Sequence, residues 1–457
     1  MQSDSSLIGG SFKDPSGFVF SKDGEIYRQI NFTYKNNYEM FMRCGLYDKL
    51  VEANTLISHK EVSVEAQNSN IAYKIIKPER ISFISYPYEW CFGQLKDAAL
   101  LTLNLQKTAL DFDMTLKDAS AFNIQFVKGN PKLIDTLSFE KYDEGEPWIA
   151  YKQFCEHFLG PLVLMAFKDY RLSQLFKVFI NGIPLDLVSS VLPKTSWLNP
   201  GIFIHIHLHS KAQKKYEERR IFSKKVFFSK THFYALIDNL QSVVEKLKLN
   251  KKHSHWKDYY VSNNYSPHSF EFKKSVILDF IDILKPFNVW DLGCNTGGFS
   301  EIAASKNIET IAFDNDFFCI EDIYNKSKFE KILPLFLDLL NPTPSLGWAN
   351  LERDSLIKRG PADLVMALAL IHHLAISCNI PFIKIADFFS KICNWLIIEF
   401  VEKEDSMAQK LFNSRKDIFP HYNSENFKAT FEKKFITEKT VEIPGSHRTL
   451  YLMRAKK

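Results

Sequence analysis

Hydrophobic positions recur with two alternating periods in the C-terminal part of the chain. From about residue 272, runs with helical spacing alternate with short apolar runs typical of buried strands. Helices are expected over 275–284, 297–306, 316–327 and the 380s, and strands over 288–293, 308–314, 332–338, 362–370 and 394–400. Strands that alternate with helices form a parallel sheet covered on both faces, so the pattern predicts a doubly wound α/β domain. Two final runs, 435–443 and 448–455, predict a closing antiparallel hairpin.

The first 200 residues show a mixed α+β pattern instead. Asp23-Gly24 is a turn pair between strand-like runs that together span 18–30. The runs that follow predict a helix, two strands and a long helix over 38–53, 71–76, 81–86 and 90–110. Together these runs predict a separate α+β domain.

A strongly basic stretch follows this domain, and a helical pattern continues from it. Charge runs of this kind are usually solvated, so the stretch is interpreted as a partly helical connector. The expected organisation is therefore a first domain over 1–205, a connector over 206–265 and the α/β domain over 266–457.

Composition adds few constraints to this organisation. Of 457 residues, 46% are hydrophobic and 40 are Phe, which argues against long disorder. The formal charge of +5 is mild, and the seven Cys lack metal-ligand spacing, which favours reduced thiols. Neither a signal peptide nor an apolar run long enough to span a membrane is visible, so a cytoplasmic protein is expected.

The α/β domain carries a glycine-rich turn between its first strand and the next helix. This turn reads Asp291-Leu-Gly293-Cys-Asn295-Thr-Gly297. Small residues there let the backbone turn sharply and approach a ligand. Asp314 and Asp338 end the next two strands, and in such a sheet these strand ends line one crevice.

This set of residues resembles the class I S-adenosylmethionine (SAM)-dependent methyltransferases, whose first motif is D/E-x-G-x-G-x-G. The resemblance implies that the turn binds SAM, that Asp314 binds the ribose diol and that Asp338 lies near the adenine amino group. Asn295 replaces the middle glycine, and Asn tolerates left-handed backbone angles. The dinucleotide pattern G-x-G-x-x-G is absent, which disfavours a nicotinamide fold.

Three polar side chains are candidates for catalysis. Methyl transfer needs a general base only if the acceptor atom carries a proton to lose. His372 and His373 follow a strand, and the resembled family often carries His-His-Leu there, facing cofactor and substrate. Hydrogen bonding that holds the loop is the alternative role for this pair. Glu399, at the end of 394–400, is the other candidate, with a helix cap or a structural pair as its alternative role.

The acceptor is inferred mainly by exclusion. Methyltransferases that modify nucleic-acid amino groups commonly show N/D-P-P-Y/F where this chain has Leu-Ala-Leu-Ile-His-His-Leu, so nucleic acid is disfavoured. The chain also resembles bacterial methyltransferases linked to nodulation and glycan modification. A small-molecule or glycan acceptor is therefore expected, and no metal is expected in the methyltransferase domain. Oligomeric state is open, and a bifunctional kinase–methyltransferase or a SAM-binding scaffold are the alternatives.

The first domain resembles the protein-kinase-like fold. Asp118, Asn123 and Asp135 match the acceptor-orienting Asp and the two Mg²⁺-binding residues of that family, which implies a Mg-ATP site. Leu116 stands where the family has His, and Arg28 stands on the strand that should carry Lys. Three interpretations stay open: a degenerate module that binds substrate or regulates, an active phosphotransferase, or an unrelated α+β domain.

Three histidines alternate in the segment Ile204-His-Ile-His-Leu-His209. On a strand His205, His207 and His209 would share one face. A polar strand face is expected, with a metal site as the alternative.

Overall fold

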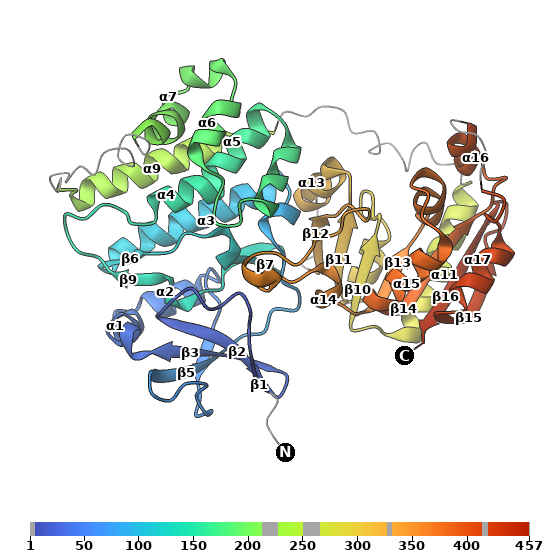
Figure 1. Cartoon of the computed structure of the whole chain (residues 1–457), viewed down its shortest axis with the longest axis horizontal. Helices are drawn as coiled ribbons and strands as arrows, with labels where there is room; N and C mark the ends of the chain where they lie inside the picture. Colours follow the sequence, from blue (N-terminus) through green and yellow to red (C-terminus); the bar gives the residue numbers. More distant parts are fainter. Residues whose placement is uncertain (1–4, 213–226, 250–265, 327–330, 414–418, 457) are drawn as a thin grey trace. The chain divides into compact units, whose positions relative to one another are not determined.

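The structure is a computed structural model that describes residues 5–212, 227–249, 266–326, 331–413 and 419–456. The chain forms two compact units, coloured along the sequence in Figure 1. The first unit is Met1–Lys252 together with Ser345–Arg353, and the second is His253–Pro344 together with Asp354–Lys457. A short segment that interrupts the second unit in sequence is therefore part of the first, which no pattern in the sequence predicted.

The second unit is built on a seven-stranded sheet. Its strands are β10 (Asn288–Leu292), β11 (Glu309–Asp314), β12 (Ile332–Phe336), β13 (Ala362–Ala367), β14 (Cys393–Val401), β15 (Phe435–Glu442) and β16 (Arg448–Ala455). Their order is β12-β11-β10-β13-β14-β16-β15. The first five pair in parallel, and β16 runs antiparallel between β14 and β15. The predicted α/β sheet with a closing hairpin is confirmed.

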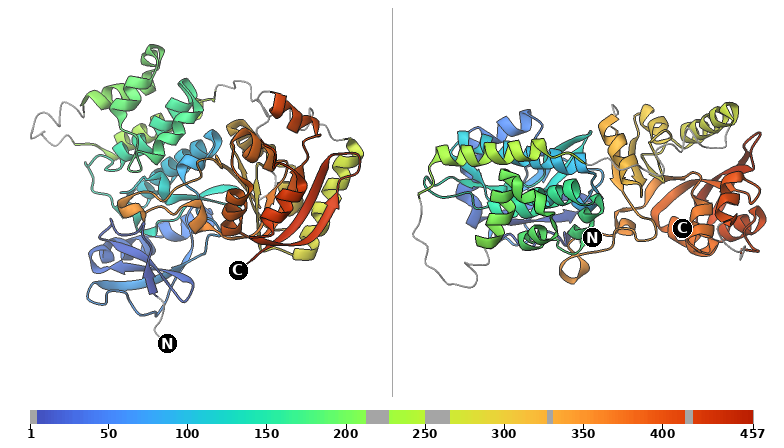
Figure 2. Two further views of the ribbon diagram at one scale, coloured as in Figure 1. Left: turned by 45° about the vertical axis from the view of Figure 1, so that its right-hand side comes forward. Right: turned by 90° about the horizontal axis from the view of Figure 1, so that it is seen from above.

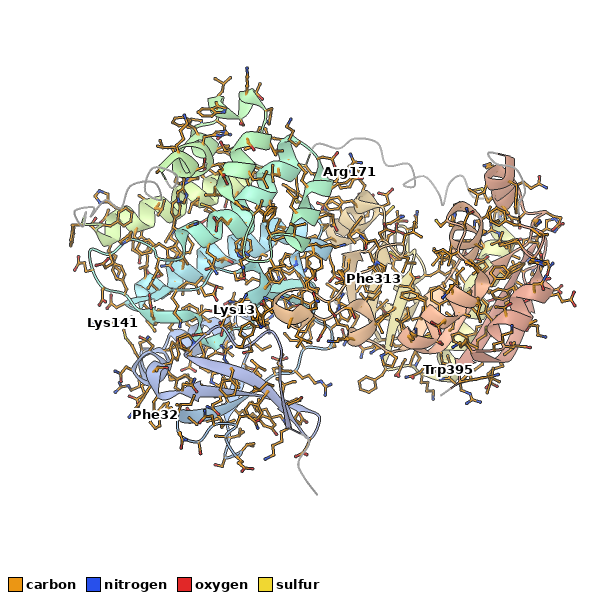
Figure 3. All side chains as sticks on the ribbon, viewed as in Figure 1. Lys13, Phe32, Lys141, Arg171, Phe313 and Trp395 are labelled. Atoms are coloured by element: carbon orange, nitrogen blue, oxygen red, sulfur yellow. The ribbon has the colours of Figure 1, made fainter. Side chains whose placement is uncertain are left out.

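Helices cover both faces of this sheet. They are α11 (Pro267–Leu284), α12 (Ser300–Ser305), α13 (Phe317–Lys326), α14 (Leu356–Arg359), α15 (Phe382–Ile392), α16 (Ser406–Asn413) and α17 (Ser424–Phe431). On one face, Ile277 and Phe280 of α11 share a buried cluster with Val289, Leu364 and Leu450 from three strands. Figure 2 shows α11 as the yellow helix that lies along the sheet. Phe313 of β11, labelled in Figure 3, lies within the sheet layer and is almost fully buried.

The winding of the sheet reverses at its first strand. β10 has β11 on one side and β13 on the other. Because successive parallel connections are right-handed, the helix after β10 and the helix after β13 cover opposite faces. Ligands of such sheets bind at this switch point, beyond the carboxyl ends of the strands.

The first unit has a five-stranded antiparallel sheet in the order β1-β2-β3-β5-β4. Its strands are β1 (Ser5–Leu7), β2 (Gly17–Lys22), β3 (Glu25–Asn31), β4 (His59–Glu61) and β5 (Ala72–Pro78). Two short strand pairs follow. The hairpin of β7 (Ile124–Val127) and β8 (Asn130–Leu133) lies in sequence between β6 (Met114–Leu116) and β9 (Phe139–Lys141), which pair with each other. Ile30, Ile76 and Leu137 pack with Tyr34 and Tyr38 into one cluster. The predicted hairpin over 18–30 is confirmed.

Helices make up the rest of the first unit. They are α1 (Lys35–Arg43), α2 (Leu46–Glu52), α3 (Phe92–Asp111), α4 (Tyr151–Phe154), α5 (Gly160–Phe167), α6 (Leu185–Val191), α7 (Pro200–Ile202) and α9 (Lys230–Lys246). The long α3 is buried over most of its length. α9 lies within the predicted connector and packs on α3, and Lys107 bonds Asp238 across the two helices at 2.7 Å. The rest of the connector, over 213–226 and 250–265, lies outside the described residues.

Three local predictions in this unit were wrong, and the first two concern residues 81–86 and 38–53. Residues 81–86 form no strand, because side chains take the place of a strand partner: Ser85 N donates to Gln125 Oε1 at 2.8 Å, and Tyr86 N donates to Glu89 Oε2 at 3.0 Å. The helix expected over 38–53 is broken into α1 and α2 at Gly45, whose φ of 89° is left-handed.

The histidine segment is helical rather than extended. Phe203–Leu208 continues α7 as a π-helix, so the three histidines share no strand face, although His205 and His209 both pack against Tyr151. His205 bonds Tyr151 and Asn239, and His207 bonds Ser189 and Ser196. Within the described ranges, no group of three or more His, Cys, Asp or Glu could hold a metal ion.

None of the helices that the structure describes is long and apolar enough to cross a membrane. None of the seven cysteines, all of which are described, forms a disulfide bond.

The aromatic cluster on the α15–α17 face predicts a large stability effect. Phe427 is fully buried, with its ring centroid 4.8 Å from that of Phe400. We expect Phe427→Ala to lower the free energy of unfolding of the second unit by about 3–5 kcal/mol, because the cavity cannot close completely. Urea denaturation followed by circular dichroism measures this loss. Phe287→Ala removes an exposed ring of the same unit and serves as the control; equal losses in the two variants would contradict the packing described.

Candidate functional site

The loop that follows β10 has the tight backbone that its sequence predicted. Gly293, Asn295 and Gly297 have φ angles of 75°, 52° and 86°, all in the left-handed region. The N–H groups of Gly293 and Cys294 both donate to Phe313 O, at 2.8 and 3.0 Å, which ties the loop to β11. A Cβ added at Gly297 would lie 3.2 Å from Ile323, so this position is closely packed as well as left-handed.

Asn295, the departure from the glycine pattern, fits the turn. Its side-chain Oδ1 accepts the N–H of Thr296 at 2.8 Å, so the amide folds onto its own loop. Its backbone N–H donates to Asp314 Oδ2 at 2.7 Å. The residue that breaks the pattern thus connects the loop to the acid at the end of the next strand.

Asp314 and Asp338 stand at the ends of β11 and β12. Asp314 is only 8% exposed, and its second oxygen accepts the N–H of Asp316 at 2.8 Å. Burial raises the pKa of Asp314 to about 6, although its backbone hydrogen bonds oppose the shift. Asp338 is half-buried and accepts the N–H of Leu340 at 2.9 Å. The structure therefore places both acids at the carboxyl edge of the sheet.

Asp291 lies beneath the loop rather than at its surface. Its Oδ2 accepts a hydrogen bond from the Ser300 hydroxyl at 2.6 Å, which joins β10 to the first turn of α12. Burial raises the pKa of Asp291 to about 7. The side chain is therefore placed to support the loop, whereas Asp314 reaches the crevice edge.

Glu399 is fully buried in β14 and makes three polar contacts. Its Oε2 accepts hydrogen bonds from Lys273 Nζ and from the backbone N–H of Ala369, each at 2.7 Å. Its Oε1 lies 3.6 Å from the Arg448 guanidinium. Arg448 in turn binds Asp405 through Nε and a terminal nitrogen, at 2.8 and 3.2 Å. Sequence reasoning missed Lys273, Arg448 and Asp405, which belong to no recognisable motif.

His372 and His373 lie on the turn that Glu399 holds. Their ring centroids are 4.2 Å apart, and His372 Nδ1 is buried with no hydrogen-bond partner among the described residues. Burial and the positive charge of Arg448 lower the pKa of His373 to about 4, and the pKa of His372 lies well below its ordinary value because of burial and its neighbours His373, Arg448 and Lys273. Both rings are therefore neutral near pH 7.

The four residues singled out in the first unit also come together. Asp118 Oδ1 accepts the Ser120 N–H at 3.0 Å and the Gln153 amide at 2.7 Å. Burial and the nearby charge of Asp135 raise the pKa of Asp118, and Asn123 also influences it. Arg28, on β3, forms an ion pair with Asp135 at 2.5 Å.

The Asp135 carboxylate already has three partners within the protein. Besides Arg28, its Oδ1 accepts the Leu137 N–H at 2.9 Å, and its Oδ2 accepts the Ser138 hydroxyl at 2.8 Å. Asp135 therefore caps the short helix that begins at Thr136. A carboxylate with these partners has little capacity left to hold a cation.

The segment Ser345–Arg353 packs onto the loop of the first unit that runs from Asp118 to Asn123. The Arg353 guanidinium lies 4.3 Å from the centre of the Phe122 ring, within the electrostatic reach of Asp118. Lys13 Nζ donates to Glu352 Oε2 at 3.0 Å, which anchors the segment a second time. A Cβ on Gly9 would come within 2.1 Å of Leu351 O, so only glycine permits this close approach. The Gly9-Gly10 pair was the signal in the sequence that could have indicated a close backbone contact.

Comparison with known proteins identifies a relative over nearly the whole chain. No family model matches the sequence. The nodulation protein NoeA of Rhizobium meliloti (strain 1021) is 35% identical over 454 residues, covering 97% of this chain and 95% of that protein. The chain belongs to the NoeA family. Because both units lie within the aligned region, the NoeA relationship extends to the first unit as well as the sheet-containing second one.

Similarity to solved structures is weaker and covers less of the chain. The magnesium protoporphyrin IX methyltransferase of Synechocystis PCC 6803, solved with bound SAH, is 14% identical, covers 45% of this chain and 90% of its own, and has a TM-score of 0.30. WbdD, crystallised with the kinase inhibitor LY294002, is 19% identical, covers 40% of each chain and has a TM-score of 0.28. These values carry no functional argument, so assignment to the NoeA family depends on the sequence relative alone.

The raised pKa of Asp291 predicts a specific pH dependence. Its folded-state pKa of about 7 exceeds the ordinary value of 3.8, so the folded state retains a proton that the unfolded chain loses as the pH rises. The stabilisation from Asp291 is therefore complete below about pH 4 and is lost as the pH rises to 7. We expect Asp291→Asn to gain stability relative to the wild type between pH 5 and pH 8.

Thermal unfolding of both proteins at the two pH values measures this gain. Asp363→Asn is the control, because Asp363 lies at the amino edge of β13 and binds the Phe287 N–H there. A stability difference between Asp291→Asn and the wild type that does not change with pH would contradict the prediction.

Proposed function

We propose that the second unit is a SAM-dependent methyltransferase that acts on a small-molecule or glycan acceptor. The observation that carries this proposal is the bond from the left-handed loop residue Asn295 to Asp314. It presents a glycine-rich backbone and an oriented carboxylate together at the switch point of a doubly wound sheet. A nucleoside ligand needs this combination: a carboxylate accepts hydrogen bonds from its ribose diol, and a backbone without bulky side chains lets the other parts of the ligand pack against the loop.

The residues of the loop and strand ends fit this cofactor in chemistry. Gly293, Asn295 and Gly297 provide the backbone surface, Asp314 the ribose acceptor and Asp338 a partner for the adenine amino group. When bound, SAM supplies a methyl group on a positively charged sulfur. The protein has to align the acceptor with that methyl group and exclude water, since in-line displacement gains most from positioning.

The neutral histidines suit an acceptor that loses a proton. In the proposed reaction His372 or His373 takes that proton as the acceptor atom gains the methyl group. The unpartnered His372 Nδ1 supports His372 for this role, because a buried nitrogen without a partner is costly unless a ligand completes it. For Glu399 we propose a positioning role, since lysine, arginine and a backbone N–H already surround it.

Membership of the NoeA family bears on the acceptor. The relative's name connects it with nodulation, and the chain resembles nodulation- and glycan-associated methyltransferases. We therefore favour a glycan or a small molecule over nucleic acid. A SAM-binding scaffold without catalysis is the alternative, and release of S-adenosylhomocysteine distinguishes the two.

Isothermal titration of the full chain with SAM tests the cofactor site. We expect the wild type to bind SAM and Asp314→Ala to lose this binding. The substitution removes the carboxylate that would accept hydrogen bonds from the ribose diol and that accepts the Asn295 N–H of the loop. Asp363→Ala, a carboxylate at the opposite edge of the same sheet, should retain wild-type affinity. Unchanged affinity in Asp314→Ala would show that the site is assigned to the wrong residues.

For the first unit we propose a degenerate kinase-like module that recognises the acceptor or regulates, rather than a phosphotransferase. Two observations favour this reading. The carboxylate of Asp135, expected to hold Mg²⁺, already contacts Arg28, Leu137 and Ser138. Arg353 and its segment cover the loop that joins Asp118 to Asn123 through Phe122. Mg-ATP therefore fits poorly there, because a guanidinium already pairs with the expected Mg²⁺ ligand.

A thermal-shift assay on the full chain separates this proposal from the bifunctional alternative. We expect SAM to raise the melting temperature and Mg-ATP to leave it unchanged. Arg28→Lys restores the residue type of the kinase-like pattern and is the informative variant: it should still give no shift with Mg-ATP, because Asp135 keeps its other partners. A clear upward shift with Mg-ATP in the wild type would favour a phosphotransferase instead.

A further inference from the structure

Lys273 is a buried lysine to which no sequence motif points. It lies on α11, ahead of the sheet in the chain, and only 2% of it is exposed. Its ammonium donates to Glu399 Oε2 at 2.7 Å and lies 4.7 Å from the centre of the Phe299 ring. A charge buried this deeply is costly unless it is paired, so its position depends on Glu399. Lys274, the next residue, is partly exposed and pairs with Glu271 on the surface.

Glu399 connects this lysine to the turn after β13. The same Oε2 atom accepts the N–H of Ala369 at 2.7 Å. Ala369 has a φ of 50°, a left-handed conformation that residues with a side chain rarely adopt. A fixed acceptor on its N–H therefore helps hold an unfavourable backbone, and the loss of that acceptor should release it.

The turn at Ala369 contacts both the cofactor loop, residues 293–297, and the histidine pair of the proposed site. Leu370 lies 3.5 Å from where a Cβ on Gly293 would be, so the residue after Ala369 touches the cofactor loop. His373 N donates to Leu370 O at 3.1 Å, which closes the turn around the histidine pair. A shift of Ala369 would therefore move Leu370 and both histidines together.

The other oxygen of Glu399 is constrained as well. Arg448, on β16, lies 3.6 Å from Oε1 and is itself held by two bonds to Asp405. The carboxylate thus has a cation on each side, and rotating it away from Ala369 would weaken its contact with one of them. This geometry distinguishes Lys273 from an ordinary core side chain.

We propose that Lys273 is a positioning residue for the proposed methyl transfer: through Glu399 it fixes the Ala369 turn that presents Leu370 to the cofactor loop and His372 and His373 to the acceptor. This inference rests on the proposed function for its purpose, but its geometry is independent of the ligand. Lys273 contacts neither cofactor nor acceptor. Together with Arg448 it also favours the uncharged form of His372, as a nearby positive charge must.

Three variants of the full, ligand-free chain test the inference. Lys273→Met keeps the length of the side chain and removes its charge, Lys273→Arg keeps the charge, and Lys274→Met is the matched surface control. Nuclear magnetic resonance follows the exchange of the Ala369 amide hydrogen, with the amide of Met366 in β13 as the internal reference. Titration of the histidine rings in the same samples reports their pKa values.

In Lys273→Met we expect the Ala369 amide to exchange at least about tenfold faster relative to Met366, since a hydrogen bond to a charged group is lost or loosened. The pKa of His372 should rise, because one of the positive neighbours that lower it is gone. Lys273→Arg should restore both readouts in part, and Lys274→Met should change neither.

Two results would overturn the inference: equal acceleration of Ala369 and Met366, which would indicate a general loss of stability, or an unchanged pKa of His372. If Lys273→Met does not fold, Glu399→Gln tests the same geometry with little change in side-chain size: the Ala369 amide should again exchange faster relative to Met366, and equal acceleration of the two would contradict the inference. Failure of the wild type to bind SAM would refute the proposed function yet leave the exchange and titration results to decide the role of Lys273.

Discussion

A single buried carboxylate, Glu399, determines the arrangement of the candidate site in the second unit. It has no solvent exposure, and Lys273, Arg448 and the Ala369 N–H surround it. Leaving any of these charges unpaired would be costly, so the helix before the sheet, the last strand and the turn after β13 are held in fixed relation. The positions of His372, His373 and the part of the loop after β10 that contacts Leu370 depend on this arrangement.

Most of the second unit could be predicted from periodicity and chain order. The alternation of helical and strand-like runs predicted the parallel sheet and the final hairpin. A strand that is buried on both faces must be almost continuously apolar, and such runs are easy to recognise in a sequence. The glycine-rich turn and Asp314 were found for a similar reason, since a left-handed loop needs particular residue types. Lys273, Arg448 and Asp405 could not be found, because a buried ion pair is made by residues distant in sequence whose types are common on surfaces.

The first unit was harder to predict for physical reasons that particular residues illustrate. Residues 81–86 look like a strand, but the side chains of Gln125 and Glu89 take the backbone hydrogen bonds a strand would need. The alternating histidines look extended, yet they lie in a helix, where His205 bonds Tyr151 and His207 bonds Ser189. The contact of Ser345–Arg353 with Gly9 and Phe122 joins distant parts of the chain, and local pattern carries no signal for that.

The central claim is that this member of the NoeA family transfers methyl groups from SAM. Incubation of the full chain with methyl-labelled SAM and cell extract, followed by mass spectrometry, tests it most directly. The account predicts a labelled glycan or small molecule together with release of S-adenosylhomocysteine, neither of which appears with Asp314→Ala. Label that enters nucleic acid would contradict the acceptor class, and S-adenosylhomocysteine release that is no greater than with Asp314→Ala would contradict the activity itself.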